Sequence, residues 1–500
     1  MFHPIHFSIP NAPKIPSFLF KIYLTNGISV MYEGADFLAH VVNTLTEERK
    51  TMALFRKGIT LKTKTMAFTG DPIVPPLPSR VMLPLKHAIG EPAHPVVKKG
   101  DTVTVGQVIA TAPSRTSLPL HATIAGTIGE DSEYLDCTGT PIPSLTIDSD
   151  GGDTWDTPDN EEKALSSHTP AEIIERIHAA GLITTHLASV PLAGDLMPMD
   201  QPKTHLIDGH QITQKIDTLL ITAFDKEPSL GVNRYYAGNT TEDLADGITA
   251  LKMITGAPAV RFVVDTHYGP YPQLKELVAA DEEETTTITS VNGRRFPIGM
   301  AIPVIKAALG REVPLPFGHP RDVGVALYDI STVIAVGTAL RTHLPQVESL
   351  ITVGGGALSQ TGIVKVRIGT PIREVFEALG GFHTDPAKII LGGPMTGMAH
   401  YDLDVPVTKD TEGLFALTHD EIQLAGDYRQ CINCGLCVKV CPVNLLPGVL
   451  SLYCVNDKFD MAEAEGLFNC IECGCCDYVC PSRRPLVHLF RHAKRQVMEA

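Results

Sequence analysis

The chain has 500 residues, of which 44% are hydrophobic, and its formal net charge is -15. This length predicts roughly two to four domains, and the composition lets each of them bury a core. The acidic balance argues against a nucleic-acid partner, because phosphate contacts need clustered Lys and Arg. No apolar run of the sequence reaches the roughly 18 to 20 residues that span a bilayer.

Residues 1–51 differ in character from the rest of the chain. Their apolar run from Phe18 to Leu24 is short and is interrupted by Lys21, which is not the pattern of a signal peptide. We interpret 1–51 as an extension that is either poorly ordered or the product of a mis-assigned start, with Met52 as a plausible true beginning.

Short β-type runs separated by Gly and Pro fill residues 52–145, after a stiff Pro-rich stretch at 72–78. The pattern around Gly100-Asp101 and Gly106-Gln107 resembles the barrel-sandwich fold of biotinyl and lipoyl carriers. A carrier needs an exposed lysine at a hairpin tip, and residues 111–129 contain no lysine. We therefore predict a structural or docking module.

Residues 146–168 are rich in Asp, Gly, Thr and Glu and are predicted to be a linker. From 169 to 345, helix and strand patterns alternate, which favours a layered α/β domain with a mainly parallel sheet. Thr169 before Pro170 is a good helix start. The expected strands are 217–223 and 260–265, and the expected helices are 241–255 and 299–309.

Residues 346–412 suit a small β-grasp unit, with strands at 350–353 and 363–368 before one helix at 371–379. Gly354 to Gly356 are interpreted as a turn of this unit and not as a phosphate loop, because no long helix comes after them. Residues 420–500 are predicted to be helical around the cysteines. The fold class is thus multidomain α/β with a helical twin-cluster tail.

Ten of the eleven cysteines lie after residue 430, and eight of them form two C-x2-C-x2-C-x3-C-P runs. This spacing is typical of bacterial ferredoxins that hold two [4Fe–4S] clusters. Zinc is the alternative, but zinc ligands usually come as two pairs with a longer loop between them. Cys137, Cys454 and the off-pattern Cys475 are interpreted as structural.

The geometry of each run predicts which thiols share a cluster. Three thiolates on one tight loop can point at one iron–sulfur cube, while the fourth faces away and completes the other cube. Cluster 1 is therefore assigned to Cys431, Cys434, Cys437 and Cys480. Cluster 2 is assigned to Cys470, Cys473, Cys476 and Cys441.

The order of these parts resembles the RnfC family of the Rnf electron-transport complex over about 55–500. The stretches that match are Phe55-x-x-Gly58-Ile59, Pro84-Leu85-x-x-x-Ile89-Gly90, Gly100-Asp101-x-Val103-x-x-Gly106-Gln107, Arg367-Ile368-Gly369-Thr370-Pro371, Gly392-Gly393-Pro394-Met395-x-Gly397, Asp404-Val405-Pro406-Val407-Thr408-Lys409 and the tail from Cys480-Pro481-Ser482 to Lys494. Together they are specific, although no single one is.

The resemblance implies an α/β domain related to the flavin- and NADH-binding subunit of respiratory complex I. This sequence departs from that pattern, because residues 182–189 lack the expected glycines and 271–276 lack another. Of the acidic stretch that comes after the next strand, only Glu227 and Pro228 align, so Glu227 is the one candidate residue for FMN or NADH. FMN is a possible cofactor, but these departures argue against it and against NADH oxidation by this chain.

The resemblance implies a peripheral iron–sulfur subunit of a membrane-bound, ion-translocating oxidoreductase, on the cytoplasmic side of the bacterial inner membrane. It would pass electrons between a soluble carrier (ferredoxin, NADH or a cytochrome) and the other subunits. The acidic run 281–284 is most simply a solvated loop, although it could attract a cationic cytochrome. The alternatives are a soluble flavin and iron–sulfur reductase of the cobalamin-reductase type, and an assembly protein whose clusters only hold the tail together.

Overall fold

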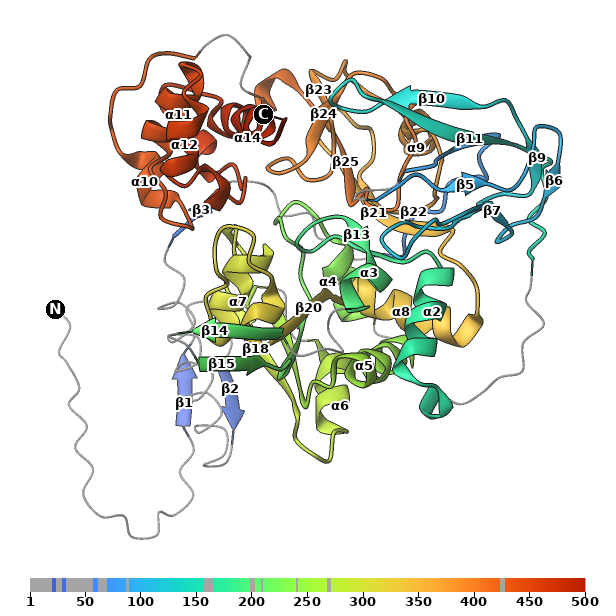
Figure 1. The fold of residues 1–500 in the computed structure, drawn as a ribbon, viewed down its shortest axis with the longest axis horizontal. Coiled ribbons are helices and arrows are strands. Elements are labelled where there is room, and N and C mark those ends of the chain that lie inside the picture. The colour runs from blue at the N-terminus through green and yellow to red at the C-terminus, as the bar shows by residue number, and fades with distance from the viewer. Residues whose placement is uncertain are drawn as a thin grey trace.

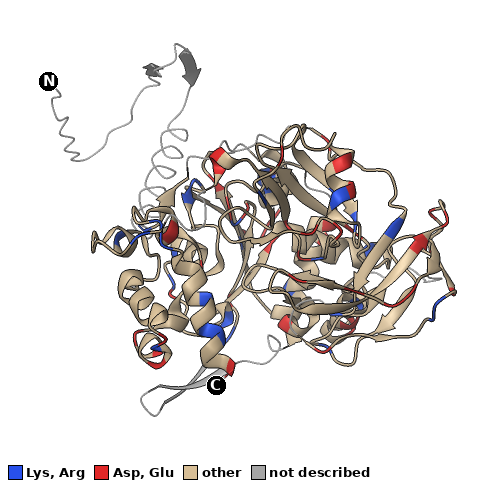
Figure 2. Ribbon diagram, turned by 90° about the horizontal axis from the view of Figure 1, so that it is seen from above, with Lys and Arg blue, Asp and Glu red and all other residues tan. Residues whose placement is uncertain are grey.

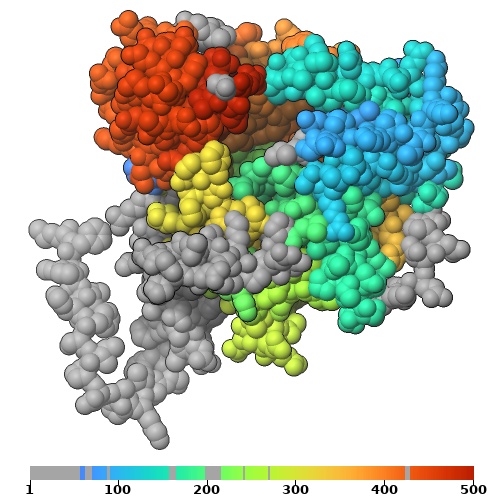
Figure 3. Space-filling model, in the orientation of Figure 1, coloured from blue at the N-terminus to red at the C-terminus, as the bar shows by residue number. Residues whose placement is uncertain are grey.

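The computed structural model describes residues 20–23, 29–32, 57–61, 70–86, 90–156, 165–197, 203–207, 210–239, 242–267, 271–422 and 428–499 (Figure 1). The predicted extension at 1–51 lies outside these residues except for β1 (Phe20–Tyr23) and β2 (Ser29–Tyr32), which pair antiparallel. Figure 3 shows the parts packed together, with the C-terminal helices at one corner of the molecule. Within the described residues, no helix combines the length and the apolar character needed to cross a membrane.

The N-terminal domain is built from short antiparallel strands in two sheets. Its longest strand, β11 (Pro141–Ser149), pairs with β4 (Arg80–Pro84) and with β9 (Gly126–Ile128). Alternate side chains such as Leu83 and Ile147 point into the core and are fully buried. The linker that we predicted from 146 therefore starts too early, because Thr146 to Ser149 still make these pairings.

The other strands of this domain are β5 (His94–Pro95), β6 (Thr102–Val103), β7 (Val108–Thr111), β8 (Leu120–His121) and β10 (Ser132–Leu135).

The α/β domain contains a four-stranded parallel sheet in the order β18-β17-β16-β20, as the alternating pattern predicted. The strands are β16 (Thr218–Thr222), β17 (Ala259–Asp265), β18 (Thr286–Val291) and β20 (Val325–Asp329). Helices α2 (Pro170–Ala179), α5 (Glu242–Thr255) and α8 (Ile330–Thr342) contribute to one core, and α7 (Ala301–Leu309) contributes to a second. The predicted start of α2 is confirmed, because Thr169 and Glu172 form a capping box.

Two glycines let α5 and α8 approach each other closely. A Cβ on Gly247 would lie 2.0 Å from the carbonyl oxygen of Val333, and one on Gly337 would lie 1.9 Å from that of Asp243. The helices therefore pack backbone against backbone. This contact fixes the N-terminus of α8, where Asp329 is the N-cap residue.

The smaller elements around this sheet are β12 (Ile183–Thr184), β13 (Val190–Pro191), α3 (Leu192–Leu196), β14 (Lys203–Ile207), β15 (His210–Gln214), α4 (Val232–Gly238), α6 (Pro272–Ala279) and β19 (Arg295–Phe296), with short 3-10 turns at Leu165–Ser167 and Pro320–Val323. The residue predicted to open α5, Thr241, lies outside the described residues, and the helix is described from Glu242.

The next unit, which we call the β-grasp unit after its predicted fold, has a mixed five-stranded sheet in the order β22-β21-β25-β23-β24. Its strands are β21 (Glu348–Gly354), β22 (Gly362–Arg367), β23 (Lys388–Leu391), β24 (Met398–His400) and β25 (Gly413–Leu417). One helix, α9 (Ile372–Ala378), packs on the sheet through Val375 and Phe376. The chain turns directly after Gly355, which confirms the predicted turn after the first strand.

The C-terminal domain is helical, as predicted. It contains α10 (Leu436–Val440), α11 (Pro447–Val455), α12 (Phe459–Ala464), α13 (Cys475–Tyr478) and α14 (Leu486–Glu499), with 3-10 turns at His419–Glu421 just before it and at Leu467–Asn469. Leu450 of α11 and Phe490 of α14 are fully buried in its core. The N-terminal strand β3 (Ile59–Thr60) pairs with β19, and Gly58 donates its backbone N–H to Val440, so this segment links the C-terminal and α/β domains.

Candidate metal centres and the neighbouring cavity

The two cysteine runs adopt the same backbone conformation at matching positions. Asn433 and Glu472 have φ values of 55° and 57°, and Gly435 and Gly474 come next with 71° and 76°. Each run thus makes a tight loop that turns through left-handed residues and ends in a short helix, α10 or α13. A tight loop of this kind lets several side chains of one run converge.

One group of thiols lines a small hollow close to the surface. Its sulfur-bearing residues are Cys431, Cys434, Cys437 and Cys480, of which Cys434 is exposed and the others are half-buried. Helix α11 closes the hollow at Gly448, where a Cβ would lie 3.8 Å from the Cys437 Sγ and 4.0 Å from the Cys431 Sγ. We name this group the outer pocket. It brings together three thiols of the first run and one of the second.

A second group lies deeper and consists of Cys441, Cys470, Cys473 and Cys476. Burial raises the pKa of the Cys470 thiol to about 12. The pKa of Cys476 is raised by burial, by Asp477, and by the nearby thiolates of Cys470, Cys473 and Cys441. Cys441, Cys470 and Cys476 pack in the core of the C-terminal domain, and Cys473 packs in the neighbouring cluster with Phe296. We name this group the inner pocket.

The donor set fits iron–sulfur clusters. Buried thiols do not ionise on their own, and iron supplies the positive charge that keeps a coordinating thiol deprotonated. Backbone N–H groups already point at sulfur: Leu445 donates to the Cys441 Sγ over 3.3 Å, and Asn433 to the Cys431 Sγ over 3.4 Å. Hydrogen bonds to sulfur of this kind tune cluster potentials.

A single metal ion is a different case from a cluster. Within the described part of the chain, no three His, Cys, Asp or Glu residues are arranged to hold one ion. The four thiols of a [4Fe–4S] cluster bind to four different irons, so they spread wider than the ligands of one tetrahedral zinc.

The inner pocket faces the other domains. The Cys475 Sγ, next to it, donates to the Phe296 carbonyl oxygen over 3.8 Å. A Cβ on Gly474 would lie 3.1 Å from the carbonyl oxygen of Met395 in the β-grasp unit. Cys475 thus contacts the α/β domain, Cys454 is buried in α11 and Cys137 is exposed in the N-terminal domain.

An ion-pair network ties the second cysteine run to the β-grasp unit. Glu472 accepts from Arg491 over 2.7 Å and from Lys494 over 2.8 Å, both on α14. Arg491 also donates to the carbonyl oxygen of Thr396 over 3.3 Å. Figure 2 shows Lys and Arg gathered on this C-terminal helix.

Glu227, the predicted FMN or NADH residue, is fully buried and binds to protein. Its carboxylate accepts from the backbone N–H of Met395 over 2.9 Å, from that of Thr396 over 2.8 Å, and from the Thr396 hydroxyl. A Cβ on Gly393 would lie 2.3 Å from its Cδ, so a larger residue there would displace the carboxylate. Glu227 therefore anchors the loop that contacts Gly474.

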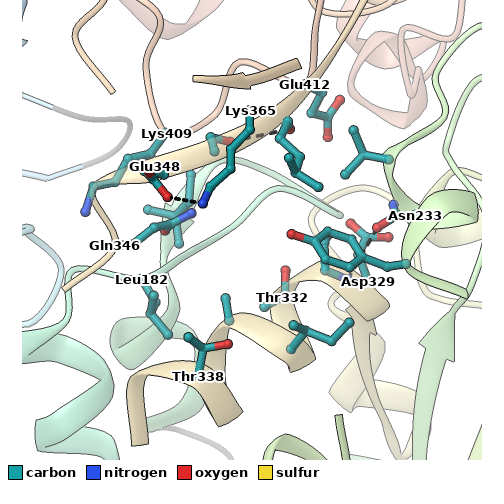
Figure 4. Close-up of a pocket in the computed structure, with 18 of the residues that line it drawn as sticks. Leu182, Asn233, Asp329, Thr332, Thr338, Gln346, Glu348, Lys365, Lys409 and Glu412 are labelled. Atoms are coloured by element: carbon teal, nitrogen blue, oxygen red, sulfur yellow. Dashed lines mark hydrogen bonds and ion pairs between the residues drawn. The ribbon is translucent and has the colours of Figure 1, made fainter. Parts of the chain in front are cut away.

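A cavity of about 710 Å³ opens between the α/β domain, the β-grasp unit and the N-terminal domain (Figure 4). This volume lies within the range of small-molecule sites. Its wall includes Leu182, Tyr235, Thr332 at the start of α8, and Trp155, but not Glu227. The cavity thus lies beside the predicted residue and is lined by its neighbours Asp225 and Lys226.

Charged groups of the cavity are mostly paired. Lys365 is 2.6 Å from Glu348, Lys226 contacts Glu412, and Asp329 is 2.8 Å from His186. Burial raises the pKa of Asp225 to about 6, although Arg234 opposes the shift. Sequence reasoning missed these residues because they come from segments far apart in the chain.

Lys409 is the buried lysine of the cavity wall. Its ammonium donates to the Gly181 carbonyl oxygen over 2.6 Å, and burial lowers its pKa to about 7. The sequence signal was present, because Lys409 ends the stretch Asp404-Val405-Pro406-Val407-Thr408-Lys409. That signal pointed to a family and did not reveal where the side chain lies.

The loop expected to hold a nucleotide phosphate does not form a glycine-lined cradle. Between 181 and 189, Gly181 is the one glycine, and its carbonyl oxygen accepts from Lys409. Leu182, Ile183 and Thr185 place side chains in the wall where backbone N–H groups would have to approach a phosphate. The described residues 181–189 thus do not fit the phosphate of FMN in the way that the family resemblance implies.

Matches to models of known protein families define the class of protein to which this chain belongs. The RnfC barrel sandwich hybrid domain matches residues 53–152, the SLBB domain 350–399 and the 4Fe-4S binding domain 426–446. The chain is therefore an iron–sulfur protein with a barrel-sandwich and an SLBB domain.

Whole-chain relatives then define the family. The C subunit of the Na(+)-translocating ferredoxin:NAD(+) oxidoreductase complex of Acetobacterium woodii is 32% identical over 84% of this chain and 91% of its own length. The corresponding subunit of the proton-translocating complex of Clostridium ljungdahlii is 30% identical over 88% and 93%. The C subunit of the ion-translocating oxidoreductase complex of Rhodobacter capsulatus is 33% identical over 85% and 79%. The chain belongs to this RnfC family, which confirms the resemblance.

A solved structure is also similar. The NAD+-reducing [NiFe]-hydrogenase in its air-oxidized state covers 91% of both chains with a TM-score of 0.45 and 13% identity. We draw no functional conclusion from a likeness at that level.

Proposed function

We propose that this chain is the peripheral iron–sulfur subunit of an ion-translocating oxidoreductase complex and holds two [4Fe–4S] clusters. Cys431, Cys434, Cys437 and Cys480 would hold one, and Cys441, Cys470, Cys473 and Cys476 the other. The observation that supports this most strongly is that Cys480 of the second run lines the hollow of the first, while Cys441 of the first run packs with Cys470 and Cys476 of the second. When bound, each cluster supplies one-electron transfer.

The two cysteine pockets have different surroundings, so the pair has an interior side and a surface side. The inner pocket adjoins Phe296 and Met395, and therefore the interior of the molecule. The outer pocket reaches the surface through the exposed Cys434. We propose that electrons pass between the interior side and a partner at the outer side, within a complex on the cytoplasmic face of the membrane. Two of the named relatives are subunits of ferredoxin:NAD(+) oxidoreductase complexes, so a soluble carrier of the ferredoxin type is the proposed other partner.

FMN and NADH are left out of the proposal. Residues 181–189 lack the glycine cradle, and Glu227 is occupied by Met395 and Thr396. The alternative of a soluble cobalamin-type reductase needs a flavin, so the same observation disfavours it. A purely structural role for the clusters is disfavoured by the exposed thiol of the outer pocket, which a stabilising site would bury.

The test uses the complex purified anaerobically from native membranes. We expect about eight irons in this chain and two [4Fe–4S] signals by EPR after reduction. About four irons, or bound zinc, would contradict the two-cluster proposal. Titration with NADH in the presence of FMN should reduce neither cluster in the isolated subunit, and rapid reduction there would restore the nucleotide site to this chain.

A further inference from the structure

Exposed apolar side chains gather beside the outer pocket. Six of the 19 exposed large hydrophobic residues among the described residues lie between 432 and 455, with exposed fractions from 39% to 66%. They are Ile432, Leu436, Leu446, Val449, Leu452 and Val455, which we call the outer apolar face. Isolated apolar side chains on a surface are ordinary, but a cluster of them indicates a contact site.

This face is continuous with the outer pocket. Ile432 and Leu436 line the same hollow as its four cysteines. Gly448, in the first turn of α11, lies against the thiols of Cys431 and Cys437, so α11 runs outward from the pocket. Leu446, Val449, Leu452 and Val455 recur every third residue along its exposed side. A protein that covers the face would therefore also cover the pocket.

The outer apolar face is not needed for the domain core. Helix α11 packs inward through Leu450, Ser451 and Cys454, all of which are buried. Ser451 also accepts from Arg484 over 3.4 Å. The two sides of the helix are separate, so substitutions on the exposed side leave the inward contacts intact.

The charge around the face constrains what binds there. Residues 428–456 contain no Asp or Glu, and their formal charges are those of Arg429 and Lys439. Arg483 is also exposed, and its neighbour Ser482 accepts from the Arg429 backbone N–H over 2.8 Å. The charges next to the outer pocket are therefore basic, whereas the exposed Asp457 follows Val455 at the far end of α11.

We infer that the outer apolar face is the docking site of a second redox subunit of the complex, whose own surface is apolar at its centre and acidic where it meets the outer pocket. The inference rests on the proposed function, because it takes the outer pocket as a cluster site. A mainly apolar face with few charges is typical of a standing contact between subunits. A carrier that arrives by diffusion would be steered by a more strongly charged surface.

The test compares two double variants in the complete complex, affinity-purified through a tag on this chain. Leu452→Glu with Val455→Glu adds charge to the face on the side away from the core. Val96→Glu with Leu135→Glu is the matched control, since these residues are similarly exposed at 57% and 42% but lie in the N-terminal domain. Iron content and EPR signals of each variant are measured first, then reoxidation of its reduced clusters by the membrane subunits.

We expect the first variant to keep about eight irons while reoxidation falls at least about tenfold and the neighbouring redox subunit no longer co-purifies. The control should behave as wild type. Unchanged reoxidation in the first variant would overturn the docking site, and so would an equal loss of reoxidation in the control. Disruption of a dimer of this chain, with the neighbouring redox subunit still bound, would also overturn it. A wild-type chain without clusters would instead overturn the proposed function on which the inference rests.

Discussion

The outer and inner cysteine pockets are built from the same sequence pattern but lie in different surroundings. The outer pocket has the exposed Cys434 and is bounded by α11 and solvent. In the inner pocket, Cys441, Cys473 and Cys476 are buried, and its loop touches Phe296 and Met395. The repeat thus provides two cysteine loops of the same conformation, and contacts with the neighbouring domains make one of them internal.

This difference indicates what each pocket depends on. The outer pocket is held by the C-terminal domain alone, so its properties should respond to solvent and to a docked partner. The inner pocket is held from three sides, through Cys475, Gly474 and the Glu472 ion pairs. Substitutions in the α/β domain and the β-grasp unit should therefore affect the inner pocket more than the outer pocket.

The largest expected effect separates two adjacent cysteines of the second run. Cys476→Ser removes a proposed ligand of the inner cluster, so iron should fall from about eight atoms to about four. Cys475→Ala removes a thiol that contacts the Phe296 carbonyl oxygen and should leave the iron content unchanged. Iron analysis with EPR checks both. An equal loss from the two variants would mean that Cys475 is also a ligand.

The next largest effect is expected at Glu227, which lies beside the cavity and holds the loop that contacts the inner pocket. Glu227→Ala leaves the buried N–H groups of Met395 and Thr396 without their acceptor. We expect the free energy of unfolding to fall by about 3 kcal/mol, as measured by denaturant unfolding. The EPR signal of the inner cluster should change and that of the outer one should not.

The exposed Glu463→Ala, in the same domain as the clusters, is the control for that variant and should change stability by less than about 0.5 kcal/mol. If Glu227→Ala is as mild as this control, Glu227 does not anchor the loop.

The smallest effect compares the matching glycines of the two runs. Gly435 and Gly474 both have positive φ, so alanine should cost about 1 kcal/mol at either position. At Gly435 the new Cβ would meet nothing within 4 Å, whereas at Gly474 it would lie 3.1 Å from the Met395 carbonyl oxygen. Gly474→Ala should therefore be more destabilising by about 1 kcal/mol. Equal losses of stability would show that the inner loop does not pack on the β-grasp unit.

Some regions of the molecule could be predicted from the sequence in more detail than others. The ferredoxin-type spacing is local, so eight cysteines and their helical setting could be predicted, as could the strands β16 and β17 with their continuous apolar residues. The cavity could not be predicted, because Trp155, Asp225, Asp329 and Lys409 meet only through the packing of three domains. Likewise, the family resemblance pointed to Glu227 but could not show that Met395 and Thr396 donate hydrogen bonds to its carboxylate. The predicted start of the linker at residue 146 was wrong, because the composition of 146–149 does not reveal that these residues pair with neighbouring strands as part of β11.

The exchange of fourth ligands between the two runs is the central claim, and it is tested most directly by adding a second substitution to Cys434→Ser. That variant should lose the outer cluster and keep about four irons. Adding Cys480→Ser should then leave the iron content and the remaining EPR signal unchanged, because Cys480 belongs to the pocket already lost. Adding Cys441→Ser should remove the remaining cluster. The reverse result, with loss on adding Cys480→Ser and retention on adding Cys441→Ser, would contradict the account.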